Sequence, residues 1–114
     1  MAISEPYATS ASIGTTEYSL TNNSTSLQAV TTDGFYQLWL GLNAMAAGDQ
    51  YQVRIYEKVL SSGTQRVAYE AILTGVQYPP HFPCPTLILI NGWEMTLKKL
   101  AGTDRTLEWS IRQA

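Results

Sequence analysis

The chain has 114 residues, the size of one domain, and its composition (45% hydrophobic, 14% charged) gives a formal net charge of −2. This charge argues against nucleic acid as a partner, because binding phosphate backbones requires a concentrated basic surface. The single cysteine excludes a disulfide scaffold, and the apolar runs are too short to cross a bilayer. The first residues lack the pattern of a signal peptide, so we expect no membrane partner and folding in a reducing cytoplasm.

Residues 1–15 are expected to form an extended N-terminal arm outside the core. They contain Pro6, Gly14 and many small polar residues, with scattered larger side chains such as Tyr7. We therefore place a domain boundary after residue 15, with the arm over 1–15 and a β-sandwich domain over 16–114. The arm is expected to become ordered on a binding partner.

The segment from residue 17 to residue 42 predicts strands separated by turns. Residues 17–20 alternate polar and apolar side chains, as a half-buried strand does, and a weaker strand follows near 27–30. Asp33-Gly34 is a tight-turn signal. Both faces of 35–42 are largely apolar, which predicts a strand that is central or lies beneath another element.

The middle of the chain predicts one short helical turn and one long hairpin. Asn43 can cap a single turn of helix over 43–48, and Gly48 can end it. Alternating apolar residues over 51–58 and again over 67–73 predict two paired strands. The stretch 79–85 contains four prolines, which lack the N–H group of a sheet ladder, so it cannot be a central strand.

The last third predicts further strands. Residues 86–90 form a short apolar run typical of a buried strand, and Asn91-Gly92 is the strongest hairpin-turn signal in the chain. Segments 93–98 and 107–112 both alternate cleanly. Turn signals recurring at about eight to twelve residues favour an all-β fold. We expect an antiparallel β-sandwich of two sheets with jelly-roll-like topology, because isolated hairpins are marginal in water.

The residues needed for catalysis or metal binding are scarce. His81 is the only histidine, and with Cys84 it lies in the proline-rich stretch without a third group to orient a thiol–imidazole pair. Four glutamates on predicted strands occupy outward positions typical of a solvated sheet face, namely Glu57, Glu70, Glu94 and Glu108. We expect no enzymatic activity, no cofactor and no metal.

The aromatic side chains divide into core residues and candidate contact residues. Trp93, Trp109 and Tyr69 fall on inner faces and are expected in the core. Phe35 and Trp39 share the other face of their strand, where they are either covered by the arm or part of an interface. The candidate interface residues are Tyr7, Phe35, Trp39, Tyr56, Tyr78 and Phe82.

Several segments resemble small virion proteins of tailed bacteriophages: TEYSL (16–20), GFYQL (34–38), AGDQYQVRIYEK (47–58), GWEMTLKKL (92–100) and WSIRQ (109–113). The resemblance implies a β-sandwich that decorates or cements a capsid, commonly as a homo-oligomer such as a trimer or dimer, or less often a tail or fibre component. The implied partners are the phage major capsid protein or other virion proteins. The implied location is the virion, after synthesis in the host cytoplasm, and no functional residues can be transferred.

Two other classes of function remain as alternatives. The first is a carbohydrate-binding β-sandwich module that uses Tyr56, Tyr78 or Phe82 as stacking platforms. The second is a small hydrolase, which is the least favoured because the chain has no catalytic motif.

Overall fold

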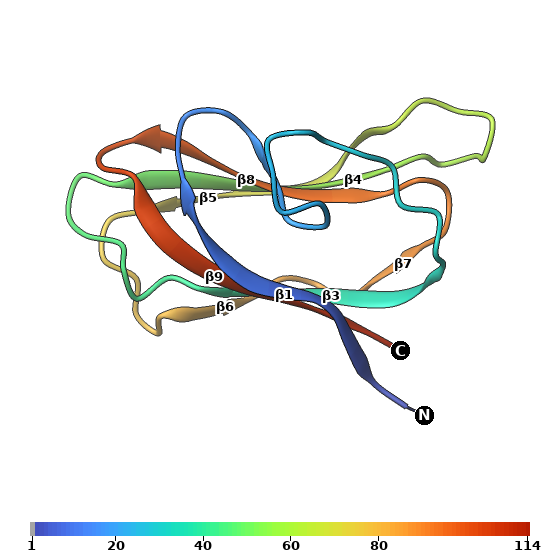
Figure 1. Cartoon of the computed structure of the whole chain (residues 1–114), viewed down its shortest axis with the longest axis horizontal. Helices are drawn as coiled ribbons and strands as arrows, with labels where there is room; N and C mark the ends of the chain where they lie inside the picture. Colours follow the sequence, from blue (N-terminus) through green and yellow to red (C-terminus); the bar gives the residue numbers. More distant parts are fainter. Residues whose placement is uncertain (1) are drawn as a thin grey trace.

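The structure is a computed structural model that describes residues 2–114, and these form nine β-strands in two facing antiparallel sheets (Figure 1). Sheet A contains β1 (Ser4–Ile13), β3 (Gly34–Gly41), β6 (His81–Pro83), β7 (Leu87–Leu89) and β9 (Arg105–Gln113). Sheet B contains β2 (Tyr18–Ser19), β4 (Gln50–Glu57), β5 (Arg66–Thr74) and β8 (Glu94–Ala101).

The strand order is that of a jelly roll. Strands β6 and β7 pair with different halves of the same edge of β3, so they fill one position. Sheet A then runs β1-β9-β3-β6/β7 and faces sheet B, which runs β2-β8-β4-β5. Apart from the β4–β5 hairpin, each connection between positions passes from one sheet to the other. Two sheets connected in this way form a jelly-roll sandwich, so the predicted fold class is confirmed.

The core lies between the sheets and follows the two-residue period of the sequence. In β4 the inward residues Tyr51, Val53 and Ile55 are fully buried, and their neighbours on β8 and β9 behave in the same way. Trp109 is 3% exposed, and its indole N–H donates to the backbone oxygen of Leu20 at 3.0 Å. The predicted inner faces of these strands are therefore confirmed.

The predicted arm is wrong for most of its length. Residues 4–13 form β1, which pairs antiparallel along β9. Ile13 is fully buried, and the ring of Tyr7 meets that of Trp93 edge-to-face, with centroids 6.1 Å apart. Because β1 is an outer strand with one face towards solvent, it needs apolar side chains only on its other face. Its many small polar residues therefore resemble the composition of a loop. The sandwich therefore includes β1, and no domain boundary lies after residue 15.

The predicted hairpin at Asn91-Gly92 is also wrong. Here the chain leaves β7 in sheet A and enters β8 in sheet B, so the strands on either side do not pair. Glu57, at the end of β4, fixes the crossing. Its carboxylate accepts the backbone N–H of Ile90 at 2.7 Å and that of Asn91 at 3.2 Å. The turn signal depends only on Asn91 and Gly92 themselves, so it could not predict this contact with Glu57 on β4.

Three weaker predictions also need correction. Residues 43–48 form turns and no helix, and in 27–30 only Val30 makes a bridge, to Trp93. Strand β7 is an outer strand, not a buried one, because Ile88 is 67% exposed. The proline-rich stretch contains the short strand β6, which lies at the edge of sheet A as its prolines require.

Asp49 joins two connections at one end of the sandwich. Its carboxylate accepts the backbone N–H groups of Thr103 (3.0 Å) and Ala46 (2.9 Å) and the Nε–H of Arg105 (2.7 Å). These bonds, led by the one from Thr103, lower the pKa of Asp49 to about 2. Gly102 has a φ of +90°, and a Cβ there would collide with Asp49, so the turn requires glycine.

Candidate functional site

The outer face of sheet B is covered where β8 passes beneath the segment 19–28. Glu94 points outward from β8, yet it is fully buried. Its carboxylate accepts four hydrogen bonds, from the hydroxyls of Ser19 (2.8 Å) and Thr21 (2.6 Å) and from the backbone N–H groups of Gln28 (2.8 Å) and Met95 (2.9 Å). The prediction that Glu94 lies on a solvated face is wrong, because alternation gives the direction of a side chain and not what covers it.

A second carboxylate, that of Glu17, forms hydrogen bonds with side chains at the neighbouring outward positions of sheet B. Glu17 accepts hydrogen bonds from the hydroxyls of Tyr56 and Thr96, both at 2.5 Å. Burial and the bond to Glu17 raise the pKa of Tyr56. Beside this group, Arg54 forms an ion pair with Glu70 at 2.7 Å. Tyr56, a candidate interface residue, is therefore held within a polar network and does not present a free aromatic face.

The outer face of sheet A has no such cover among the described residues. Phe35 on β3 is 51% exposed and lies opposite Ile88 on β7, which is 67% exposed. We call these two side chains the apolar pair. Strand β9 separates β1 from β3, so the N-terminal segment does not cover Phe35. Of the two explanations left open for this residue, cover by the arm is excluded.

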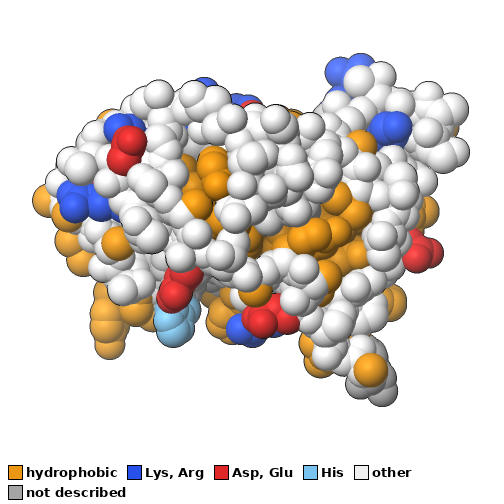
Figure 2. Space-filling view, in the orientation of Figure 1, with side chains coloured by type: hydrophobic (Ala, Val, Ile, Leu, Met, Phe, Trp, Pro, Cys, Tyr) orange, Lys and Arg blue, Asp and Glu red, His pale blue; other side chains and the backbone are white. Residues whose placement is uncertain are grey.

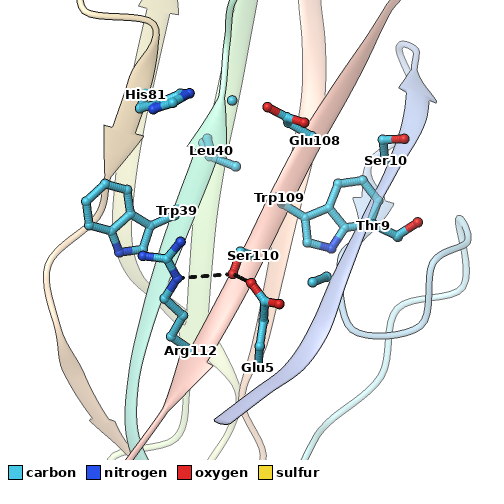
Figure 3. A pocket seen from close by; sticks show the side chains of 12 residues that line it. Glu5, Thr9, Ser10, Trp39, Leu40, His81, Glu108, Trp109, Ser110 and Arg112 are labelled. Carbon is cyan, nitrogen blue, oxygen red and sulfur yellow. Dashed lines mark hydrogen bonds between the residues drawn. The ribbon is translucent and has the colours of Figure 1, made fainter. Parts of the chain in front are cut away.

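Trp39 lies four residues further along β3, on the same face, and is half-buried. The guanidinium of Arg112 lies 4.6 Å from the centroid of its ring, which is a cation–π contact. The indole N–H donates to the side-chain oxygen of Gln37 at 3.0 Å. Arg112 in turn donates through Nε to the hydroxyl of Ser110 at 3.2 Å, and that hydroxyl donates to Glu5 (Figure 3).

A groove of about 440 Å³ lies on the outer face of sheet A and crosses β1, β9, β3 and β6; its lining includes Trp39, Arg112 and Ser110. Two rows of paired positions form its floor. One row runs Ser10, Glu108, Gly41, His81 across the four strands, and the next contains Ala8, Ser110 and Trp39. In Figure 2 the pale blue histidine and nearby acidic side chains lie on the lower surface of the molecule, which is this side of sheet A.

The side chain of Glu108, in the first row, extends over Gly41 on the neighbouring strand. A Cβ on Gly41 would collide with Cγ, Cδ and Oε1 of Glu108. Within the described chain, Glu108 forms no ion pair and no side-chain hydrogen bond, and neither does His81. The groove thus offers a carboxylate and an imidazole that are free to contact a ligand. Sequence reasoning placed Glu108 correctly on an exposed face but gave no sign that it borders a groove.

Of the six candidate interface residues, only Phe35 and Trp39 share a surface. The side chains of Tyr7 and Phe82 are partly buried against the core, and Tyr56 lies on sheet B. Tyr78 is 94% exposed in the loop before β6. The three proposed stacking platforms therefore form no row.

Figure 2 also shows hydrophobic atoms between the two layers on the side where β1 lies in front.

The described residues contain no group of three or more His, Cys, Asp or Glu side chains that could hold a metal ion. Cys84 is 1% exposed, and its burial raises the pKa of the thiol to about 12, so the nucleophilic thiolate is suppressed at neutral pH. Residues 2–114 include no helix long and apolar enough to cross a membrane.

Fold and site together define a jelly-roll sandwich with an open, mixed polar and aromatic groove on one sheet. No family model matches the sequence, and no curated protein matches it. Among solved structures, the chain is similar to Eiger TNF from S. frugiperda, with a TM-score of 0.49 and 11% sequence identity over 95% of this chain and 85% of that one. The fold assignment stands on the strand order, and the resemblance to phage virion proteins remains a prediction.

Proposed function

We propose that this protein is a non-enzymatic structural component of a phage virion that binds and stabilises the capsid surface. The observation that carries the proposal is the apolar pair, Phe35 and Ile88, which is held outward on neighbouring strands. Removing such side chains from water stabilises a complex with another protein surface. The resemblance of the sequence to small virion proteins supports the identity of the partner, and viral capsid domains are among the proteins that use jelly rolls.

The test is reattachment to particles that lack the protein. Virions of a phage whose genome lacks the gene for this protein are mixed with the purified protein. They are then sedimented and assayed for the bound chain. The unaltered protein should bind in a fixed ratio to the capsid protein, and Phe35→Ser with Ile88→Ser should weaken binding at least tenfold. Val59→Ser with Leu60→Ser is the matched control, because these side chains are 94% and 67% exposed in the β4–β5 hairpin.

Each result bears on a different part of the proposal. Failure of the unaltered protein to bind would reject capsid attachment. Equal loss in both double variants would reject the apolar pair as the contact. Separating heads from tails before sedimentation distinguishes capsid decoration from a place in the tail or fibre.

We also propose that copies of the chain associate as dimers or trimers. Strand β5 supports this, because it is a nine-residue edge strand with Val67 and Ile72 43% and 52% exposed. The unpaired backbone groups of such an edge are a template for another strand. Val67→Lys with Ile72→Lys should shift the association equilibrium towards monomer, as measured by sedimentation equilibrium. Val76→Lys, in the loop after β5, should not. A monomeric unaltered protein at high micromolar concentration would reject self-association.

A further inference from the structure

The groove on sheet A combines a flat aromatic side chain with polar groups that have unused hydrogen-bonding capacity. The indole of Trp39 is half-buried at one end, and the guanidinium of the exposed Arg112 lies over one face of its ring. Arg112 uses its Nε–H for Ser110, and its terminal N–H groups have no hydrogen-bond partner in the described chain. Glu108 can accept several hydrogen bonds, and Ser10 is paired with it on the neighbouring strand. Figure 3 shows these side chains around one open space.

The dimensions of the groove suit a small ligand. The row from Ser10 to His81 spans three strand spacings, about 14 Å in all. The volume of about 440 Å³ lies within the range of small-molecule sites. A groove of this length accommodates about two or three sugar rings placed end to end.

The chemistry of the lining distinguishes between classes of ligand. Two carboxylates, on Glu5 and Glu108, accompany one guanidinium, so a phosphate-rich ligand is disfavoured. A wholly apolar ligand is disfavoured as well, because it would remove these charged groups from water without giving them partners. A sugar ring has an apolar C–H face for the indole, and hydroxyls that donate to Glu108 and accept from Arg112.

We propose that this groove binds a neutral saccharide of two or three units, which displaces the guanidinium of the exposed Arg112 from one face of the Trp39 ring. The sugar then stacks on that face, and Glu108 and Arg112 are the hydrogen-bonding groups. This role goes beyond capsid attachment and does not depend on it. Gly41 is a positioning residue, because its missing Cβ leaves the space in which the Glu108 side chain crosses the sheet. The site differs from the aromatic row of Tyr56, Tyr78 and Phe82 predicted from the sequence.

The experiment is an NMR titration of the folded protein with four trisaccharides in turn: cellotriose, maltotriose, tri-N-acetylchitotriose and mannotriose. The chain has three tryptophans, and Trp39→Phe identifies which indole N–H signal belongs to the groove. At least one trisaccharide should shift the Trp39 signal while those of the buried Trp93 and Trp109 stay in place. The expected Kd is on the order of 1 mM, because a shallow site must order its polar side chains on binding.

Two variants and a control test the assignment of the residues. Glu108→Gln removes the charge of the acceptor, and Gly41→Ala displaces the Glu108 side chain without changing its chemistry, so each should weaken binding at least tenfold. Val59→Ser lies in the β4–β5 hairpin, outside the groove, and should bind as the unaltered protein does.

Other results would overturn the proposal. They are the absence of any shift at about 10 mM of each trisaccharide, ten times the expected Kd, and an equal affinity in Gly41→Ala and the unaltered protein. Loss of virion attachment in Gly41→Ala, with no shift of Trp39 by any sugar, would assign the groove to a protein contact instead. Sugar binding by a chain that does not attach to virions would reject only the capsid proposal.

Discussion

The outer faces of the two sheets are opposites. On sheet B the outward side chains of β8 are polar, yet Glu94 and Thr96 are buried beneath other segments and fully hydrogen-bonded. On sheet A the outward side chains include Phe35 and Trp39, which no described segment covers. From polarity alone, the apolar side chains of sheet A would be expected to be covered and the polar side chains of sheet B to be exposed. The covered face therefore contributes to stability, while the uncovered face is available for binding.

The largest expected effect comes from Trp109, which connects the core to the segment that covers sheet B. Trp109→Ala should lower the free energy of unfolding by about 3–5 kcal/mol, because it leaves a cavity and removes the hydrogen bond to Leu20. Equilibrium denaturation in urea measures the change. A loss below about 1 kcal/mol would mean that the two layers do not depend on this contact.

The sharpest comparison is between two glutamates that both point outward. Glu94→Ala should cost about 2–4 kcal/mol, because it leaves buried donors unsatisfied. Glu108→Ala should change the stability by less than about 0.5 kcal/mol, since that side chain is exposed and unpaired. The same denaturation experiment tests both, and equal costs would remove the distinction between the two faces.

The pH dependence of stability should come from Asp49, away from both outer faces. Its pKa in the folded chain is about 2, below the ordinary value of 3.8, so folding favours the carboxylate. The stabilisation is complete above the ordinary pKa and is lost as the pH falls from about 4 towards 2. Urea midpoints over this range should fall in the unaltered protein and fall less in Asp49→Asn. Parallel curves would assign the acid sensitivity to other groups.

The smallest effect is expected for the apolar pair. Phe35→Ser and Ile88→Ser should each change the free energy of unfolding by no more than about 0.5 kcal/mol, because at least half of each residue is exposed in the folded chain and neither belongs to the buried core. Thermal unfolding checks this. A marked loss of stability would show that the pair is structural, and the loss of virion attachment in the double variant could then not be assigned to a contact.

The inner faces of the strands could be predicted from the sequence because burial between two sheets imposes a period of two. Tyr51, Val53 and Ile55 follow that period, and so do the inward residues of β8 and β9. Strand β1 was missed because an outer strand needs few apolar residues. The hairpin signal at Asn91-Gly92 failed because Glu57, far away in the sequence, holds the chain in a crossing between sheets.

The candidate site could be predicted only in part, because strand order decides which residues become neighbours. Phe35 and Trp39 were identified from the apolar second face of their strand. Glu108, Gly41 and His81 come from three different strands, and only the pairing of β9, β3 and β6 brings them into one row. No periodicity within one segment contains that information.

The place of β9 in sheet A has a consequence for how the chain folds. It follows the other eight described strands in the sequence, yet it lies between β1 and β3 and pairs with both. Sheet A therefore cannot close during translation until residues 105–113 have left the ribosome, and β1 must wait for a partner about a hundred positions away. Contacts between such distant segments slow folding. A nascent chain halted before residue 105 should remain sensitive to proteases.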